Sequence, residues 1–236
     1  NDSTELVYAL NLLDTAITAR SLSGSSPTEF LSCFSQWLHN QINQGPMLFA
    51  ASFRASGNLL SQWRGYSNHG KGVSLGFNHE AIQSLATTQN FHLGQCVYDA
   101  NKQHLLASEI VDCLISMYQE SEVINAIFQS VEADLMTICA LLKHPSFAEE
   151  QERRLISPTF ISTDDAPIAF REGKAMLVPY YLFDLELDGM INLDHVFVGP
   201  TPNAALSVNA LMHYLTNKAA RLKRGISDSE IPYRPR

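Results

Sequence analysis

The spacing of hydrophobic residues predicts long helices in the first part of the chain. Apolar side chains recur at helical steps over 3–20 and again from 102 to 142, a segment that we divide into two helices near Ser121. Pro27 is placed to open a further helix between them, because its fixed φ suits the first helical position. The apolar face expected for the first helix is made of Leu6, Leu10, Leu13 and Ile17.

Short apolar or alternating runs predict strands, which become frequent after Pro145. The expected strands are 47–53, 72–78, 92–99, "ERRLIS", "IAFRE", "MLVPYYLFDLEL" and "HVFVGP". Further helices are expected over 58–66, 79–89 and 204–222. The elements do not alternate regularly as strand and helix, so the pattern favours an α+β fold with a mixed or mainly antiparallel sheet. We predict one domain over 1–236, helix-rich over 1–145, strand-rich over 146–200, with a C-terminal helix and tail over 201–236.

Composition is that of a globular protein. Of the 236 residues, 45% are hydrophobic and 17% are charged. No apolar run is long enough for a membrane span, so no membrane partner is expected. The net charge of −8 does not support binding to nucleic acid. The four cysteines are widely spaced, which favours free thiols and a cytoplasmic location.

The stretch "FAEEQERRLI", 147–156, combines charge with a choice of structure. As a strand, alternation would place Glu150, Glu152 and Arg154 on one face. As a helix, Glu149, Glu152 and Arg153 would become neighbours and form an ordinary solvated surface. Pro158 follows the apolar end, which favours a strand that begins near Gln151 after a turn or short helix.

Three interpretations of these charges stay open. A carboxylate held beside an arginine could contact a ribose hydroxyl, act as a base or stabilise a developing cation. Alternatively, Glu150 or Glu152 pairs with Arg154 or Lys143 as an ordinary surface ion pair. Two carboxylates at this spacing could also share a metal ion, with Asp99 as the nearest third ligand. No histidine pair has metal-site spacing, so we assign no metal.

A second candidate lies in "SQWRGYSNHGKGVSLGF", 61–77. Trp63, Arg64 and Tyr66 crowd a helix end, and an arginine with two aromatic rings suits an anionic ligand that carries a planar base. In the simpler alternative, Trp63 and Tyr66 are core aromatics and Arg64 is solvated. We predict a polar cleft between this turn and the 150–154 strand.

The order of these motifs resembles the bacterial domain-of-unknown-function family 2971. The resembling segments are "NDSTEL", "SFR", "WRGYSNHGKGVSLGF", "KHPSFAEEQERRLI" and "HVFVGPTPN". The resemblance implies that Trp63, Tyr66, Glu150, Glu152 and Arg154 belong to one recurrent pattern. The chain departs from the family at Phe147, where tryptophan is usual, and at Arg64. The family also has an aromatic-rich strand upstream of the Asn-Asp start, so we expect an N-terminal strand to be missing.

A looser analogy gives the concrete functional hypothesis. A strand that begins with serine, followed by a Glu-x-Glu strand, is similar to ADP-ribosyltransferases, which use NAD. The analogy would make Ser52 brace the nicotinamide ribose, Tyr66 stack on nicotinamide, Arg64 meet the pyrophosphate and Glu152 act in catalysis. The expected ligand is therefore nucleotide-like, in a stress or phage-defence setting. The alternatives are a metal-dependent phosphodiesterase or nuclease and a non-catalytic interaction module; the oligomeric state is not indicated.

Overall fold

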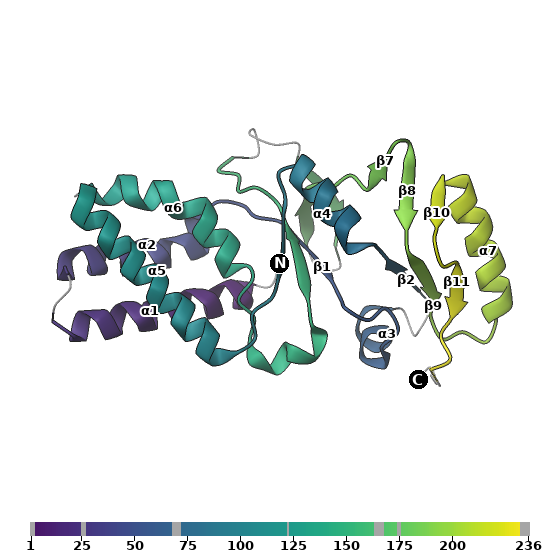
Figure 1. The fold of residues 1–236 in the computed structure, drawn as a ribbon, viewed down its shortest axis with the longest axis horizontal. Coiled ribbons are helices and arrows are strands. Elements are labelled where there is room, and N and C mark those ends of the chain that lie inside the picture. Colours follow the sequence, from purple (N-terminus) through teal and green to yellow (C-terminus); the bar gives the residue numbers. More distant parts are fainter. Residues whose placement is uncertain are drawn as a thin grey trace. The chain divides into compact units, whose positions relative to one another are not determined.

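The computed structural model describes residues 3–24, 27–67, 72–121, 123–162, 168–173 and 176–231 (Figure 1). The chain divides into two compact units. Unit 1 contains Asn1–Phe53 and Asn90–Leu182, and unit 2 contains Arg54–Gln89 and Phe183–Arg236. In both units helices accompany small sheets, which confirms the predicted α+β class. The sheets of unit 1 are antiparallel, and those of unit 2 mix parallel and antiparallel pairs.

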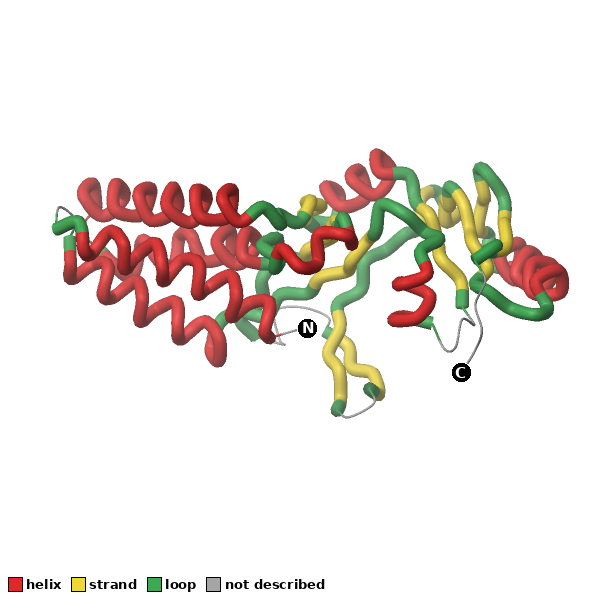
Figure 2. Tube along the Cα trace, turned by 90° about the horizontal axis from the view of Figure 1, so that it is seen from below, coloured by secondary structure: helices red, strands yellow, loops and turns green. Residues whose placement is uncertain are grey.

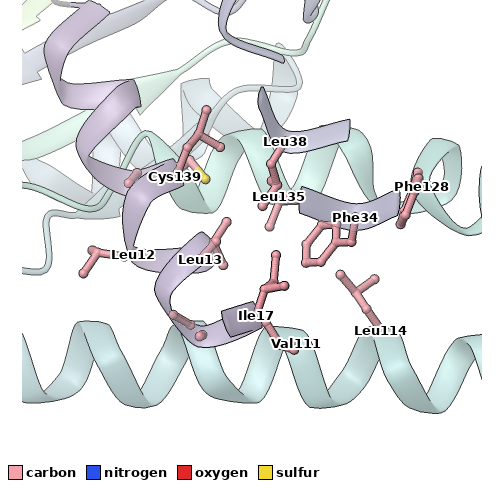
Figure 3. Packing of buried hydrophobic residues seen from close by; sticks show 14 of the residues in the cluster. Leu12, Leu13, Ile17, Phe34, Leu38, Val111, Leu114, Phe128, Leu135 and Cys139 are labelled. Carbon is pink, nitrogen blue, oxygen red and sulfur yellow. The ribbon is translucent and has the colours of Figure 1, made fainter. Parts of the chain in front are cut away.

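Four helices form most of unit 1 and pack around its main core. They are α1 (Ser3–Leu22), α2 (Thr28–Gln44), α5 (Ala100–Ser121) and α6 (Ile124–Cys139). The helical spacing predicted for α1 is confirmed, because Leu10, Leu13 and Ile17 are buried and Leu6 is partly buried. Phe34 of α2 lies among them and stacks on Phe128 of α6 with ring centroids 5.6 Å apart (Figure 3). Apolar burial along these faces stabilises the helices in this unit.

A three-stranded antiparallel sheet completes the part of unit 1 that matters for the site. The strands are β1 (Ala50–Phe53), β4 (Arg153–Ile156) and β3 (His92–Gln95), in the order β1-β4-β3. In the register, Ser52 of β1 and Gly94 of β3 both lie opposite Arg154 of β4. A Cβ on Gly94 would lie 2.7 Å from Leu141 Cδ1, so glycine allows the segment after α6 to approach the sheet closely.

The stretch 147–156 begins in a short helix and ends in a strand, as the strand interpretation predicted. A 3-10 helix, η1 (Pro145–Glu150), precedes β4. The next residue, Gln151, caps its end, and the φ of 42° at Gln151 lies in the left-handed region and turns the chain toward the strand. The predicted turn or short helix before a strand near Gln151 is therefore confirmed.

Unit 1 also contains the hairpin of β5 (Ala169–Glu172) and β6 (Leu177–Tyr180). In Figure 2 this hairpin extends away from the helices of unit 1. Within "MLVPYYLFDLEL", predicted as a strand-like stretch, 177–180 and 186–187 are strands and the residues between them are not. Tyr181, between these two pieces, packs its ring against Phe160 at 4.9 Å and Phe91 at 5.6 Å.

Unit 2 is built from two three-stranded sheets and three helices in the part that the structure describes. The order of strands is β11-β9-β2 in one sheet and β10-β8-β7 in the other. The helices are α3 (Leu60–Tyr66), α4 (His79–Thr88) and α7 (Ala204–Asn217), and the strands are β2 (Val73–Gly76), β7 (Glu186–Leu187), β8 (Met190–Leu193), β9 (His195–Val198), β10 (Ala220–Leu222) and β11 (Ile226–Asp228). Leu193, Val196 and Leu215 form one cluster of buried residues in this unit.

The predicted last helix is too long. The helix ends at Asn217, and 220–222, which we expected to be helical, form β10 beside β8. The physical reason is Ala219, whose φ of 51° takes the chain out of the helical conformation. The expected tail is also structured, because 226–228 pair with β9 as β11. Among the helices described, none has the length and apolar character needed to cross a membrane.

Candidate functional site

The side chain of Glu152 lies at the junction of β1 and β4. Ser52 Oγ and Arg154 Nε both donate to Glu152 Oε1, the latter at 2.7 Å. The backbone N–H of Glu152 donates to the hydroxyl of Tyr98 at 3.0 Å, and its carbonyl accepts from Cys96 N at 2.9 Å. Hydrogen bonds to both the side chain and the backbone of Glu152 therefore fix its position.

Lys143, in the segment after α6, contacts three carboxylates. Its Nζ donates to Glu150 Oε2 at 2.5 Å and to Glu152 Oε2, and lies 3.5 Å from Glu5 Oε1. Its backbone is fixed as well, since Gln103 Nε2 donates to the Lys143 carbonyl at 2.8 Å. The three protons of an ammonium group thus have three acidic neighbours.

Arg154 extends the same arrangement toward α1. Its Nη2 donates to Glu5 Oε2 at 2.5 Å, and its Nη1 donates to the Ala140 carbonyl at 2.7 Å, just past the end of α6. We call the five charged residues Glu5, Lys143, Glu150, Glu152 and Arg154 the charge cluster. Three carboxylates and two cations give the cluster a net charge of −1.

Contacts within the charge cluster keep its central members ionised. Burial alone would raise the pKa of Glu152, but hydrogen bonds from Arg154, Lys143 and Ser52 outweigh it and lower the pKa to about 2. Burial opposes the charged form of Lys143, yet its bonds to Glu150 and Glu152 raise its pKa overall. The pKa of Arg154 is raised in the same way, against the effect of burial, by Glu152 and Glu5.

Accessibility varies across the charge cluster. The side chain of Glu152 is 0% exposed, whereas those of Glu150 and Glu5 are 19% and 26% exposed. Ser52 is exposed, although its hydroxyl contacts the buried Glu152. The side chains of Glu5 and Glu150 are therefore partly open to solvent, whereas the carboxylate of Glu152 is not.

An aromatic group lies next to the charge cluster. The ring of Phe147 is 5.3 Å from Lys143 Nζ and is half exposed. His144 packs edge-on against Tyr8 at 5.3 Å and against Phe147 at 6.5 Å. Phe147 thus places an aromatic face beside the lysine.

The structure brings together one half of the predicted site. Ser52, Glu150, Glu152 and Arg154 meet in unit 1, and the ion-pair alternative is correct in its partners, although the pairs are more buried than an ordinary surface pair. Sequence reasoning left Glu5 out of the site and gave Lys143 only as an ion-pair partner. Both residues lay in the segments of the resemblance, which was the signal that could have placed them here.

The other half of the predicted site lies in unit 2. Trp63 is 4% exposed and its Nε1 donates to Asn58 Oδ1 at 2.9 Å, so it is a core aromatic, as in the simpler alternative. Tyr66 is exposed and its hydroxyl accepts from Arg54 Nη2 at 3.2 Å. Arg64 is exposed on α3. The middle of the stretch, 68–71, lies outside the described residues, and the cleft that would join the two stretches stays a prediction.

The charge cluster does not resemble a metal centre. Lys143 lies between Glu150 and Glu152, where a shared cation would have to sit. Asp99, the expected third ligand, instead accepts from Lys102 N at 2.9 Å in the first turn of α5. Within the described ranges, no group of three histidine, cysteine, aspartate or glutamate side chains could hold a metal ion.

Comparison with known proteins supports the family resemblance. Residues 62–155 match a family model described as "Protein of unknown function (DUF2971)". The matched segment includes Trp63, Lys143, Glu152 and Arg154, whereas Ser52 lies before it. Comparisons with curated proteins and with solved structures give no significant match. The bacterial source and cytoplasmic location stay predictions.

Proposed function

We propose that the chain binds a nucleotide-like ligand at the accessible side of the charge cluster, with NAD and transfer of its ADP-ribosyl group as the concrete form. The observation that carries the proposal is the hydrogen bond from Ser52 to Glu152, residues 100 positions apart in sequence. The analogy with ADP-ribosyltransferases requires a serine and a glutamate side by side on neighbouring strands. Here they come from β1 and from the residue that precedes β4.

The chemistry of this transfer suits ionised carboxylates. The bond between the ribose C1′ and the nicotinamide nitrogen breaks, and its electron pair leaves with nicotinamide. The acceptor nucleophile, an O–H or N–H group, forms the new bond to C1′ and releases its proton to solvent. A fixed negative charge beside the ribose lowers the energy of the positive charge that develops there. The net charge of −1 of the charge cluster has the sign that this step needs.

Exposure assigns the roles within the proposal. Glu150 is the carboxylate that faces the ligand, because it is partly exposed. Glu152, which the analogy placed in catalysis, is in this proposal a positioning residue that holds Lys143 and Arg154 in place from behind, because its side chain is 0% exposed. Ser52 is exposed and contacts the ribose directly.

The test is binding of NAD and of ADP-ribose to the full chain, followed by thermal unfolding. A ligand at about 100 times its Kd should raise Tm by about 5–10 °C. Glu150→Gln should reduce this rise and the release of nicotinamide, whereas Glu149→Gln, an exposed neighbour on η1, should change neither. Absence of a Tm shift with both ligands would remove the proposal.

A second candidate is a non-catalytic interaction module in which the charge cluster only holds the fold together. The full burial of Glu152 and its bonds to Ser52, Lys143 and Arg154 favour it. This candidate predicts that Glu152→Gln lowers stability while Glu150→Gln affects no ligand. The two candidates therefore differ in the behaviour of Glu150, which the same binding experiment measures.

A further inference from the structure

The carboxylate of Glu5 bridges two buried cations that belong to other elements. Its Oε2 accepts from Arg154 Nη2 at 2.5 Å, and its Oε1 lies 3.5 Å from Lys143 Nζ. Lys143 follows α6 and Arg154 is on β4, so neither cation shares an element with Glu5 on α1. The two oxygens of one anion thus contact a lysine and an arginine together.

This geometry matches the way in which proteins bind small oxyanions. Arginine presents paired N–H donors to carboxylate or phosphate, and lysine adds a point charge. Without Glu5, the remaining members of the charge cluster are two cations and two carboxylates, Glu150 and Glu152, with a net charge of zero. One oxyanion in the place of Glu5 would restore the charge of −1 and the contacts of both cations.

Glu5 is also the member of the charge cluster that can most readily move away from Lys143 and Arg154. It is the most exposed of the five residues, with 26% of its side chain accessible. It lies in the first turn of α1, where helices open locally at little cost. Glu152, in contrast, is 0% exposed and is tied to both strands of the junction.

We infer that Lys143 and Arg154 form a binding site for a small oxyanion, which Glu5 occupies here and which a phosphoryl group of a ligand takes by displacing Glu5. That the phosphoryl group belongs to a nucleotide rests on the proposed function; the anion site itself does not. Glu5 then acts as a built-in competitor, so its removal strengthens binding of phosphate. If Glu5 served only to contact the ligand or to hold the fold together, its removal would weaken phosphate binding or leave it unchanged.

The experiment compares the full-length protein with its Glu5→Ala and Glu29→Ala variants. Glu29 is the matched control, because it is an exposed glutamate in the first turn of a helix, α2, in the same unit. Calorimetric titration with inorganic phosphate, at constant ionic strength, should show at least about tenfold tighter binding to Glu5→Ala than to the parent protein. Glu29→Ala should behave as the parent does, and acetate should bind Glu5→Ala more weakly than phosphate.

Equal phosphate affinity in the parent and in Glu5→Ala, or no binding to either, overturns the inference. If Glu5→Ala does not fold without phosphate, refolding in phosphate but not in chloride supports the anion site, and failure in both overturns it. Glu5→Gln keeps the size of the side chain and should give a smaller gain. Phosphate binding to Glu5→Ala with no response to NAD would retain this inference and reject the proposed function. NAD binding together with equal phosphate affinity in the parent and in Glu5→Ala would retain the proposed function and reject this inference.

Discussion

The depressed pKa of Glu152 makes a quantitative prediction about acid stability. The pKa falls from 4.5 to about 2 because the ionised carboxylate accepts hydrogen bonds from Arg154, Lys143 and Ser52 in the folded protein. Since the folded pKa lies below the unfolded one, this stabilisation is fully present above about pH 4.5 and is lost as the pH falls toward about 2. The shift corresponds to about 3 kcal/mol of unfolding free energy at neutral pH.

The perturbation that isolates this effect is Glu152→Gln. Glutamine has the size of a protonated glutamate and is uncharged at every pH. The variant therefore removes the charge of Glu152 without changing the size of the side chain. We expect it to cost about 3–5 kcal/mol at neutral pH, because Lys143 and Arg154 lose a buried partner. The cost should shrink as the pH falls, since protonation removes the same charge from the parent protein.

The assay is urea unfolding of both proteins from neutral pH to about pH 2.5, in a Trp63→Phe background. The chain has two tryptophans, and this change leaves Trp37 of α2 to report on unit 1 alone. Taking the difference between the proteins removes the titration of the remaining carboxylates. A difference that stays constant with pH, or that is below about 1 kcal/mol at neutral pH, would refute the reasoning.

Three further predictions concern the cores and the thiols. Phe34→Ala should cost about 3–5 kcal/mol by urea unfolding, because a fully buried ring of the four-helix core is removed. Asn58→Ala should cost about 1–3 kcal/mol in unit 2, followed through Trp63, since Asn58 Oδ1 accepts from Trp63 Nε1 at 2.9 Å. Ellman's reagent should label the exposed Cys113 in the native protein and Cys139 only after unfolding, because burial raises the pKa of Cys139 to about 12.

Local patterns in the sequence predicted most of the elements correctly, because those elements depend on local chemistry. The helical spacing of apolar residues in 3–20 matches α1, and Pro158 correctly indicated that 153–156 is a strand. The last helix was predicted too long for a physical reason. Its apolar pattern continues past Asn217, but the conformation of Ala219, which breaks the helix, has no sequence signal comparable to glycine.

The charge cluster could be predicted only in part, because it depends on contacts between distant segments. Glu152 and Arg154 are two residues apart, so strand alternation was enough to place them together. Glu5 contacts Arg154 across 149 residues of sequence, and no periodicity indicates such a contact. The burial of Glu152 was missed for the same reason, since it follows from the packing of α1 and the segment after α6 against the sheet.

Ser52 offers the sharpest distinction between a ligand site and a structural junction. It is exposed, and its hydroxyl donates one of the hydrogen bonds to Glu152. Because Arg154 and Lys143 still contact that carboxylate, Ser52→Ala should cost only about 1 kcal/mol of unfolding free energy. Under the proposed function, however, the same variant loses a direct contact to the ribose.

The unfolding free energy and the NAD-induced rise in Tm can be measured on the same samples. Ser52→Thr is the control that retains the hydroxyl on the strand. We expect Ser52→Ala to reduce the NAD-induced rise in Tm well beyond its effect on stability, and Ser52→Thr to retain most of that rise. If both variants respond to NAD as the parent does, Ser52 has no part in ligand binding. Its hydrogen bond to Glu152 would then serve only to stabilise the fold, because the small loss of unfolding free energy in Ser52→Ala would be the only effect of removing the hydroxyl.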